Sequence, residues 1–147
     1  MKRGENGVTL IELAVVMSII AIMGVCLAPA IGEWLEDFRI RQAARDIVSN
    51  LQFAKMRAIS SRMEHRVCFD LANETYHLEK NDGGWTQEGD LFHVPRSIDI
   101  ASVTYNPPRV KFDPDGTSSN GHIRIVNDQG KIHKVVIYYT GRIRIEE

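Results

Sequence analysis

The sequence is poor in cysteine and carries almost no net charge. Its 147 residues include two cysteines, which excludes a disulfide-stapled scaffold and any zinc site built from four cysteines. Lys and Arg number 18 against 19 Asp and Glu, so the formal net charge is -1. A protein that binds nucleic acid through overall positive charge is therefore excluded. Hydrophobic residues make up 44% and charged residues 25%, as in ordinary folded domains, so the chain is not disordered throughout.

Motifs of catalysis and cofactor binding are also lacking. The chain has no Gly-x-Ser-x-Gly, no glycine-rich phosphate loop and no His-Glu-x-x-His. Asp113-Pro114-Asp115-Gly116 lacks the further ligands of a calcium loop and is interpreted as a β-turn. We predict no enzyme, no cofactor and no metal site. The histidines show no ligand spacing, and we expect surface or strand-edge positions for His65, His77, His93, His122 and His133.

Apolar residues are concentrated in residues 8–32, where the only charged residue is Glu12. A helix of these 25 residues would reach about 37 Å, against about 30 Å of bilayer hydrocarbon. The preceding leader contains Lys2 and Arg3, and basic residues hold that end of a single span in the cytoplasm. We predict an inner-membrane span with a cytoplasmic amino terminus and a periplasmic carboxyl-terminal domain.

A secretory signal peptide is the alternative interpretation of this segment. Ala28-Pro29-Ala30 is similar to a small-x-small cleavage site, and cleavage there would release a soluble secreted protein, including an enzyme. The proline inside the triplet and the early position of Glu12 disfavour that interpretation.

Glu12 is the informative residue of the apolar segment. A lone carboxylate in hydrocarbon costs several kcal/mol unless it is protonated or paired. Cleavage after Gly7 would create an ammonium group at Val8 and make Glu12 the fifth residue of the mature chain. The carboxylate of one subunit could then neutralise the amine of its neighbour, which favours side-by-side packing of helices.

The string Gly7-Val8-Thr9-Leu10-Ile11-Glu12-Leu13 resembles the prepilin signature of type IV pilins and type II secretion pseudopilins. The resemblance implies that a prepilin peptidase cuts between Gly7 and Val8 and methylates the Val8 amine. It also implies that Glu12 guides assembly with other pilin subunits, and that Pro29 takes the place of a helix-kinking proline. The departure is Val8, where the family usually has phenylalanine.

Residues 33–63 continue as a predicted amphipathic helix. Apolar residues recur at alternating steps of four and three, and we expect this stripe to pack on a sheet, with a coiled-coil seam as the alternative. Cys68, just beyond the helix, is interpreted as a small buried side chain. The stripe consists of Ile40, Ala44, Ile47, Leu51, Ala54 and Ala58.

Beyond residue 64 the pattern shortens to period two, which predicts an antiparallel β domain over residues 64–147. The fold class is therefore α+β: a long N-terminal helix, membrane-spanning in its first half, packed on an antiparallel sheet or sandwich. The two remaining segments are residues 1–7, the predicted leader, and residues 8–32, the predicted transmembrane and filament-core helix. The predicted strands are 65–71, 76–80, 91–94, 98–105, 110–112, 122–127, 131–139 and 142–145.

Two motifs in the carboxyl-terminal part of the chain make the resemblance more specific. Phe112-Asp113-Pro114-Asp115-Gly116 and Gly141-Arg142-Ile143-Arg144, after a long helix and a strand-rich middle, resemble the GspH/FimT minor pilins and minor pseudopilins. The resemblance implies a non-enzymatic structural subunit of a type IV pilus or type II secretion filament, acting in assembly or initiation at the tip.

A basic surface on the last strands supports an alternative function. If Asp128-Gln129 and Thr140-Gly141 are two-residue hairpin turns, Arg124 faces His133 and one face carries no acidic residue. In FimT-like minor pilins a Gly-Arg-x-Arg tail is associated with DNA binding in natural transformation, so double-stranded DNA is a candidate partner. An ordinary solvated face is the competing interpretation, because Glu146 and Glu147 follow directly. The predicted DNA-binding residues are Arg124, Lys131, His133, Arg142 and Arg144.

Overall fold

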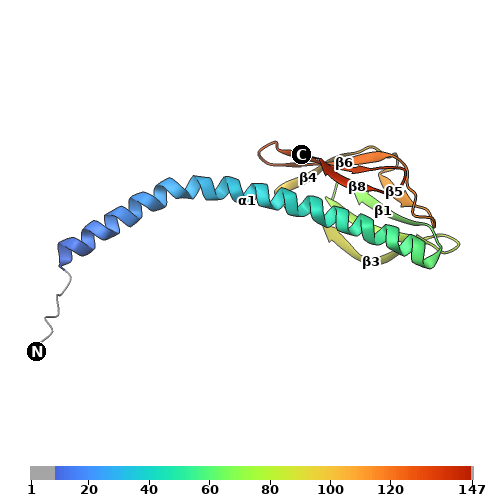
Figure 1. Ribbon diagram of the computed structural model, residues 1–147, viewed down its shortest axis with the longest axis horizontal. Helices are drawn as coiled ribbons and strands as arrows, with labels where there is room; N and C mark the ends of the chain where they lie inside the picture. Colours follow the sequence, from blue (N-terminus) through green and yellow to red (C-terminus); the bar gives the residue numbers. More distant parts are fainter. Residues whose placement is uncertain (1–8, 147) are drawn as a thin grey trace, which may run out of the picture. The chain divides into compact units, whose positions relative to one another are not determined.

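The computed structural model describes residues 9–146, with the backbone alone described for residues 26–31 and 33. One helix is followed by eight strands (Figure 1). The chain divides into two compact units, Met1–Leu35 and Glu36–Glu147. The elements are α1 (Leu10–Ser61), β1 (His65–Asp70), β2 (Thr75–Asn81), β3 (Trp85–His93), β4 (Ile98–Val103), β5 (Arg109–Phe112), β6 (Gly121–Asn127), β7 (Ile132–Ile137) and β8 (Ile143–Glu146).

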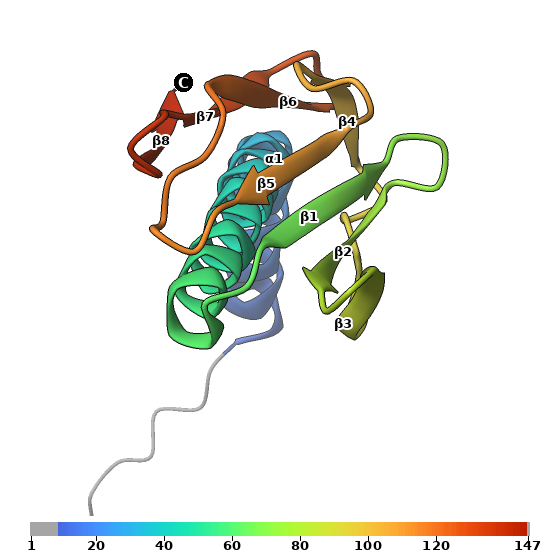
Figure 2. The same cartoon turned by 90° about the vertical axis from the view of Figure 1, so that its right-hand side faces the viewer.

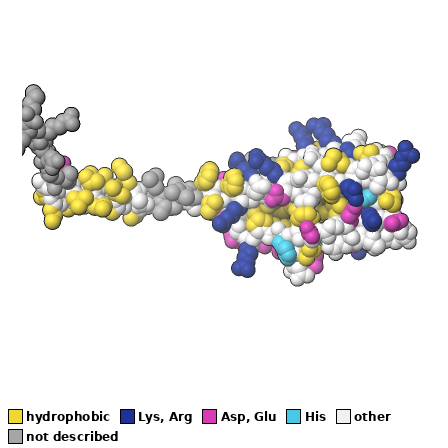
Figure 3. Space-filling view, turned by 90° about the horizontal axis from the view of Figure 1, so that it is seen from below, with side chains coloured by type: hydrophobic (Ala, Val, Ile, Leu, Met, Phe, Trp, Pro, Cys, Tyr) yellow, Lys and Arg dark blue, Asp and Glu magenta, His cyan; other side chains and the backbone are white. Residues whose placement is uncertain are grey.

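The described part of the first unit is the beginning of α1. Thr9 precedes the helix, and its hydroxyl oxygen accepts a hydrogen bond of 3.3 Å from the backbone N–H of Glu12. Every side chain described from residue 9 to residue 25 is exposed, and Figure 3 shows this stretch as an almost unbroken run of hydrophobic side chains. Within the described residues, no helical stretch combines the length and the hydropathy of a membrane span. The membrane span stays a prediction.

The second unit contains two four-stranded antiparallel sheets. The first has the strand order β3-β2-β1-β5, and the second has the order β4-β6-β7-β8. Figure 2, a view from the end of the domain, shows the two sheets arranged around the part of α1 that belongs to this unit. The prediction of an α+β fold, with a long helix packed on antiparallel sheets, is confirmed.

The core of the second unit lies between the helix and both sheets. The predicted apolar stripe is buried throughout: Ile40 and Leu51 are 0% exposed and Ile47 is 1% exposed. The stripe meets Phe112 of the first sheet and Ile125 of the second in one hydrophobic cluster. Burial of each such side chain contributes about 1.5–3 kcal/mol. The stripe therefore packs on sheets, as predicted, and is not a coiled-coil seam.

The eight predicted strands are all present, but β3 is longer than predicted. It begins at Trp85 rather than at residue 91, and its pairing with β2 continues on both sides of an irregularity at which Gly89 and Asp90 of β3 have no partner in β2. Most β3 side chains are exposed, so the strand lacks the apolar alternation that reveals a half-buried strand. β3 is an edge strand of its sheet, and the residues before 91 show no apolar alternation that predicts a strand.

His65 corrects the expectation that the histidines lie at the surface or at strand edges. Its side chain is 1% exposed at the start of β1. Its Nε2 lies 3.1 Å from a carboxylate oxygen of Glu88, and its Nδ1 lies 3.0 Å from the carbonyl oxygen of Met63. Glu88 also pairs with Arg57 of α1. The ring is buried because both of its nitrogens meet oxygen atoms, which removes the cost of burying them.

Candidate functional site

The first group of predicted site residues lies at and before the start of α1. Leu10 and Ile11 are the first two helical residues and Glu12 is the third, so Thr9-x-x-Glu12 has the spacing of a capping box. The hydrogen bond from the Glu12 backbone to the Thr9 hydroxyl satisfies one of the orphan donors of the first turn. The Glu12 carboxylate lies at the positive end of the helix dipole, where negative charge is favoured. Sequence reasoning missed Thr9, although this spacing is readable.

Glu12 lies among exposed apolar side chains. Leu10 is 86% exposed, Ile11 is 72% exposed and Leu13 is 54% exposed, and Glu12 itself is exposed. The other predicted processing residues, Gly7 and Val8, lie outside the described residues, and for Pro29 the structure describes only the backbone, which is helical.

The hairpin between β6 and β7 corrects the first predicted register. The backbone N–H of Asn127 donates to the carbonyl oxygen of Lys131 at 3.1 Å, and the N–H of Gly130 donates to Asn127 at 2.9 Å. Gly130 has a φ of +79°. The connection is therefore a three-residue turn with glycine in the left-handed position, not the predicted two-residue turn. Ile125, rather than Arg124, lies opposite His133.

The hairpin between β7 and β8 has the same turn and the same correction. The N–H of Tyr138 donates to the carbonyl oxygen of Arg142 at 2.9 Å, and Gly141 has a φ of +69°. Val136 therefore pairs with Arg144, whereas a two-residue turn at Thr140-Gly141 would place Ile137 opposite Arg144. Each hairpin is displaced by one residue, and in an antiparallel sheet a one-residue slip moves a side chain to the opposite face.

The two displacements cancel for β8 but not for β7. Arg124 and Arg144 remain on one face of the second sheet, as predicted, because β8 is displaced twice relative to β6. His133 instead faces the core and is 0% exposed, so its predicted place on the basic surface is wrong. Lys134 takes that place opposite Arg124. We refer to Arg124, Lys134 and Arg144 as the outer basic face.

The outer basic face also carries acidic side chains, contrary to the prediction. Glu146 lies opposite Lys134, and the exposed Asp99 of β4 lies opposite Val126 on the same side. Lys131 is drawn elsewhere: its Nζ lies 2.8 Å from a carboxylate oxygen of Asp37 on α1, and this hydrogen bond holds the pKa of Asp37 below its usual value. Arg142 is exposed in the turn before β8.

The glycine of the Gly-Arg-x-Arg tail has a structural reason. A Cβ atom on Gly141 would lie 2.0 Å from the carbonyl oxygen of Gly116, closer than any contact allows. Gly116 also has a positive φ, +83°, and closes the turn predicted at Asp113-Pro114-Asp115-Gly116 by donating to Asp113 at 2.8 Å. The Nζ of Lys55 donates to the carbonyl oxygen of Gly141 at 2.9 Å. The close contacts of these two glycines with each other and with Lys55 hold the hairpin between β7 and β8 next to α1.

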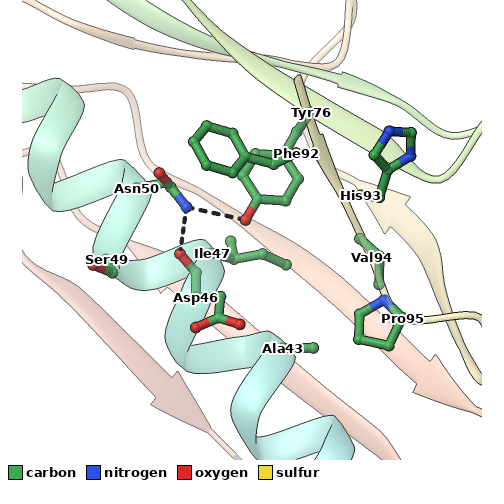
Figure 4. Close-up of a pocket in the computed structure, with 10 residues that line it drawn as sticks. All are labelled: Ala43, Asp46, Ile47, Ser49, Asn50, Tyr76, Phe92, His93, Val94 and Pro95. Atoms are coloured by element: carbon green, nitrogen blue, oxygen red, sulfur yellow. Dashed lines mark hydrogen bonds between the residues drawn. The ribbon is translucent and has the colours of Figure 1, made fainter. Parts of the chain in front are cut away.

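A hollow lies between α1 and strands β2 and β3 (Figure 4). The side-chain amide of Asn50 donates to the Tyr76 hydroxyl at 3.1 Å and to the Asp46 carbonyl oxygen at 3.0 Å. The ring of Tyr76 stacks on Phe92 at 5.3 Å between centroids. Burial raises the pKa of Tyr76, while the Asn50 hydrogen bond opposes the rise. The hydrogen bond between Asn50 and Tyr76 holds β2 against α1.

One group of potential metal donors comes together among the described residues, on the outward side of the first sheet. Cys68 of β1 is the cross-strand partner of His77 of β2, and Glu79 lies two residues further along β2. The three donor atoms all lie within 4.8 Å of one another. Arg66 donates to Glu79 as well and stacks on the Trp85 ring at 3.8 Å. The sequence does not indicate this group, because Cys68 lies on a different strand from His77 and Glu79.

Comparisons with known proteins agree with this fold. Residues 43–141 match the family of type II transport protein GspH, and residues 2–25 match the prokaryotic N-terminal methylation motif. Type II secretion system protein H of Xanthomonas campestris pv. campestris is 24% identical over 151 residues, which cover 98% of this chain and 85% of the relative.

Solved structures show the same architecture. The minor pseudopilin EpsH from the type 2 secretion system of Vibrio cholerae superposes with a TM-score of 0.62 at 14% identity, over 72% of this chain and 94% of that one. The type IV minor pilin FimU of Pseudomonas aeruginosa superposes with a TM-score of 0.63 at 18% identity, over 78% and 92% of the two chains.

A methylation motif followed by a long helix and an antiparallel β domain defines the class of pilin-like subunits. Within that class, the match over residues 43–141 shows that the chain belongs to the GspH family. The predicted resemblance to GspH-like minor pseudopilins and pilins is confirmed.

Proposed function

We propose that this protein is a non-enzymatic assembly subunit at the tip of a type II secretion or type IV pilus filament. The observation that carries the proposal is the first stretch of α1, in which exposed apolar side chains surround a carboxylate in the first helical turn. Exposed apolar surface of this extent requires lipid or neighbouring subunits to cover it. The GspH family and the methylation motif support a filament as the place where neighbours supply that cover.

Processing follows from the motif. A prepilin peptidase would cut after Gly7 and methylate the amine of Val8, within the segment that matches the methylation motif. The new positive charge would then lie close to the apolar helix, and Glu12 of one subunit would neutralise the amine of the next. Before assembly, residues 8–32 would hold the protein in the inner membrane, with the β domain in the periplasm. Pro29 has no amide hydrogen for the helix and would let this segment adjust during packing.

The test is Glu12→Ala in a strain that carries the filament genes, with Thr9→Ala as the matched control. Glu12→Ala removes the carboxylate but keeps the backbone donor to Thr9, whereas Thr9→Ala removes the cap and keeps the carboxylate. We expect both variants to reach the membrane with a mature terminus at Val8. Filament incorporation, measured by cross-linking to neighbouring subunits, should fall to background in Glu12→Ala only. Incorporation of Glu12→Ala at the normal level would refute the assigned role.

A second candidate function is capture of double-stranded DNA for uptake. It is favoured by the exposed Arg142 beside the outer basic face, because arginine binds phosphates with bidentate geometry. Glu146 and Asp99 on the same side weaken an anion site. His133 and Lys131 no longer belong to it, since one is buried and the other pairs with Asp37.

DNA capture is tested by titrating duplex DNA with the full chain in detergent at several salt concentrations. Arg142→Ala combined with Arg144→Ala should weaken binding and reduce its salt dependence. Lys80→Ala combined with Arg96→Ala removes the same charge away from the outer basic face and should leave binding unchanged. Equal loss in both double variants would show that the effect is overall charge, and the assigned DNA site would be wrong.

A further inference from the structure

The outward side of the first sheet brings a thiol, an imidazole and a carboxylate to one point. Cys68 and His77 are direct cross-strand partners, so their side chains share a face. Glu79 shares that face with His77, because side chains two residues apart on a strand point the same way. These three groups are typical ligands of divalent zinc.

The donor atoms are close together: the Sγ of Cys68, one ring nitrogen of His77 and one carboxylate oxygen of Glu79 all lie within 4.8 Å of one another. The Sγ of Cys68 lies 3.2 Å from one oxygen of Glu79, and the Nε2 of His77 lies 3.2 Å from the other oxygen. In a tetrahedral zinc site, bonds of about 2.3 Å to sulfur and about 2.0 Å to nitrogen or oxygen separate neighbouring donor atoms by roughly 3.3–3.6 Å. Small side-chain movements would bring all three donors onto a single ion.

The group can be reached from solvent. All three residues line one shallow hollow, whose wall is completed by Pro107, Pro108 and neighbouring residues. Cys68 is 7% exposed, and the side chains of His77 and Glu79 are 25% and 18% exposed. A bound ion would keep a fourth position on the open side for water or for a group from another molecule.

Arg66 and Trp85 hold the carboxylate in place. Arg66 donates to the same oxygen of Glu79 that faces Cys68, which leaves the other oxygen directed toward His77. Burial raises the pKa of Glu79, but the hydrogen bonds from Arg66, Cys68 and His77 outweigh it and the pKa is lowered. Arg66 therefore acts as the positioning residue of the Glu79 carboxylate.

We propose that Cys68, His77 and Glu79 form a binding site for one Zn²⁺ ion that ties β1 to β2. On binding, the Sγ–H bond breaks and a Zn–S bond forms, with the proton released to solvent. His77 binds through its unprotonated Nε2, and Glu79 through the oxygen that faces it. No oxidation or reduction takes place.

The experiment uses the full chain in detergent, carrying Cys26→Ala so that Cys68 is the remaining thiol. After treatment with a chelator, the protein is titrated with Co²⁺, whose thiolate charge-transfer band reports a metal–sulfur bond, and Zn²⁺ is then added in competition. We expect the band to appear at one equivalent and to disappear with Zn²⁺. Its absence in the Cys26→Ala protein would overturn the proposal.

Variants separate the three ligands from the rest of the surface. Cys68→Ser should abolish the band, and His77→Ala or Glu79→Gln should each weaken Zn²⁺ binding roughly tenfold or more. His93→Ala, at an exposed position of β3, is the matched control and should bind as the parent does. Cys68 is buried, so Cys68→Ser changes the packing of the domain as well as the site. His77→Ala and Glu79→Gln change more exposed side chains and therefore test the site separately from folding. A band that persists in Cys68→Ser, or equal binding by His77→Ala and His93→Ala, would overturn the site.

Discussion

Two stretches of the same helix differ in what surrounds them. From residue 10 to residue 25, α1 carries apolar side chains on every side, and its large hydrophobic side chains are exposed, from 48% at Val16 to 86% at Leu10. From residue 36 to Ser61, one apolar stripe is buried, with Ile40 and Leu51 at 0% exposure, while the other faces carry charged side chains together with a few exposed apolar ones such as Met56. The backbone is helical in both stretches.

The difference teaches that the apolar pattern, rather than the helical conformation, decides what a helix packs against. A stripe of about 100° matches a sheet, whereas an apolar surface on all sides needs lipid or several neighbouring helices. In this protein the second stretch stabilises the domain, and we expect the first stretch to act through partners. Substitutions that affect one stretch and leave the other unchanged test this comparison.

The largest expected effect is that of Leu51→Ala compared with Ile20→Ala. Leu51 is 0% exposed, whereas Ile20 is 58% exposed. Leu51→Ala should lower the free energy of unfolding of the β domain by about 3 kcal/mol, and Ile20→Ala should leave it unchanged. Urea unfolding of the full chain in detergent, followed by near-ultraviolet circular dichroism, measures both. Equal destabilisation by the two variants would break the comparison.

The next effect concerns the contact between the second stretch and the tail. Gly141→Ala places a Cβ atom against the Gly116 carbonyl oxygen and close to Lys55, so it should lower the free energy of unfolding by about 2–3 kcal/mol. Gly130→Ala is the matched control, because Gly130 also has a positive φ but nothing lies within 4 Å of the added atom. The control should lose about 1 kcal/mol. Thermal unfolding compares the two, and similar losses would show that the close approach is unimportant.

The smallest effect is that of the ion pair between Asp37 of α1 and Lys131. The hydrogen bond from Lys131 lowers the pKa of Asp37 from 3.8, so the folded state binds the proton less readily than the unfolded state. The stabilisation is therefore fully present above the unfolded pKa and is lost as the pH falls through the folded value. The pair is partly exposed, so the effect should be small and reduced by salt.

A double-mutant cycle measures that effect. Asp37→Asn, Lys131→Met and the combined variant give the coupling between the two side chains. The coupling should be present at pH 6 and be lost only as the pH falls below 3.8, the ordinary pKa of an aspartate. A coupling that grows as the pH falls would contradict the assigned sign.

Much of the fold could be predicted because its signals are local. The stripe from Ile40 to Ala58 follows the helical period, and the strands alternate with period two. Hairpin register was harder, since it depends on one residue of turn length. Both turns have glycine as their third residue, Gly130 and Gly141, with a positive φ, and that pattern indicates a three-residue turn. The prediction of two-residue turns was therefore wrong, although the glycine positions indicate three-residue turns.

The candidate zinc site could not be predicted, because its ligands meet only through strand pairing. His77 and Glu79 lie two residues apart on one strand, but Cys68 lies on another strand and is separated from them by a turn. The cross-strand register of β1 and β2 brings them together. Buried histidines were missed for a similar reason: His65 lies in the core because a distant carboxylate, Glu88, reaches it.

The two similar turns also differ in a way that matters for imaging. The turn at Gly141 is fixed against Gly116 and Lys55, while a side chain added at Gly130 meets open space. Asp128 and Gln129, the two residues before Gly130, are exposed. A cysteine at Gln129 therefore gives a point where a fluorophore can be attached without disturbing the helix or the tail. In living cells, a subunit labelled there would reveal where on the filament it resides.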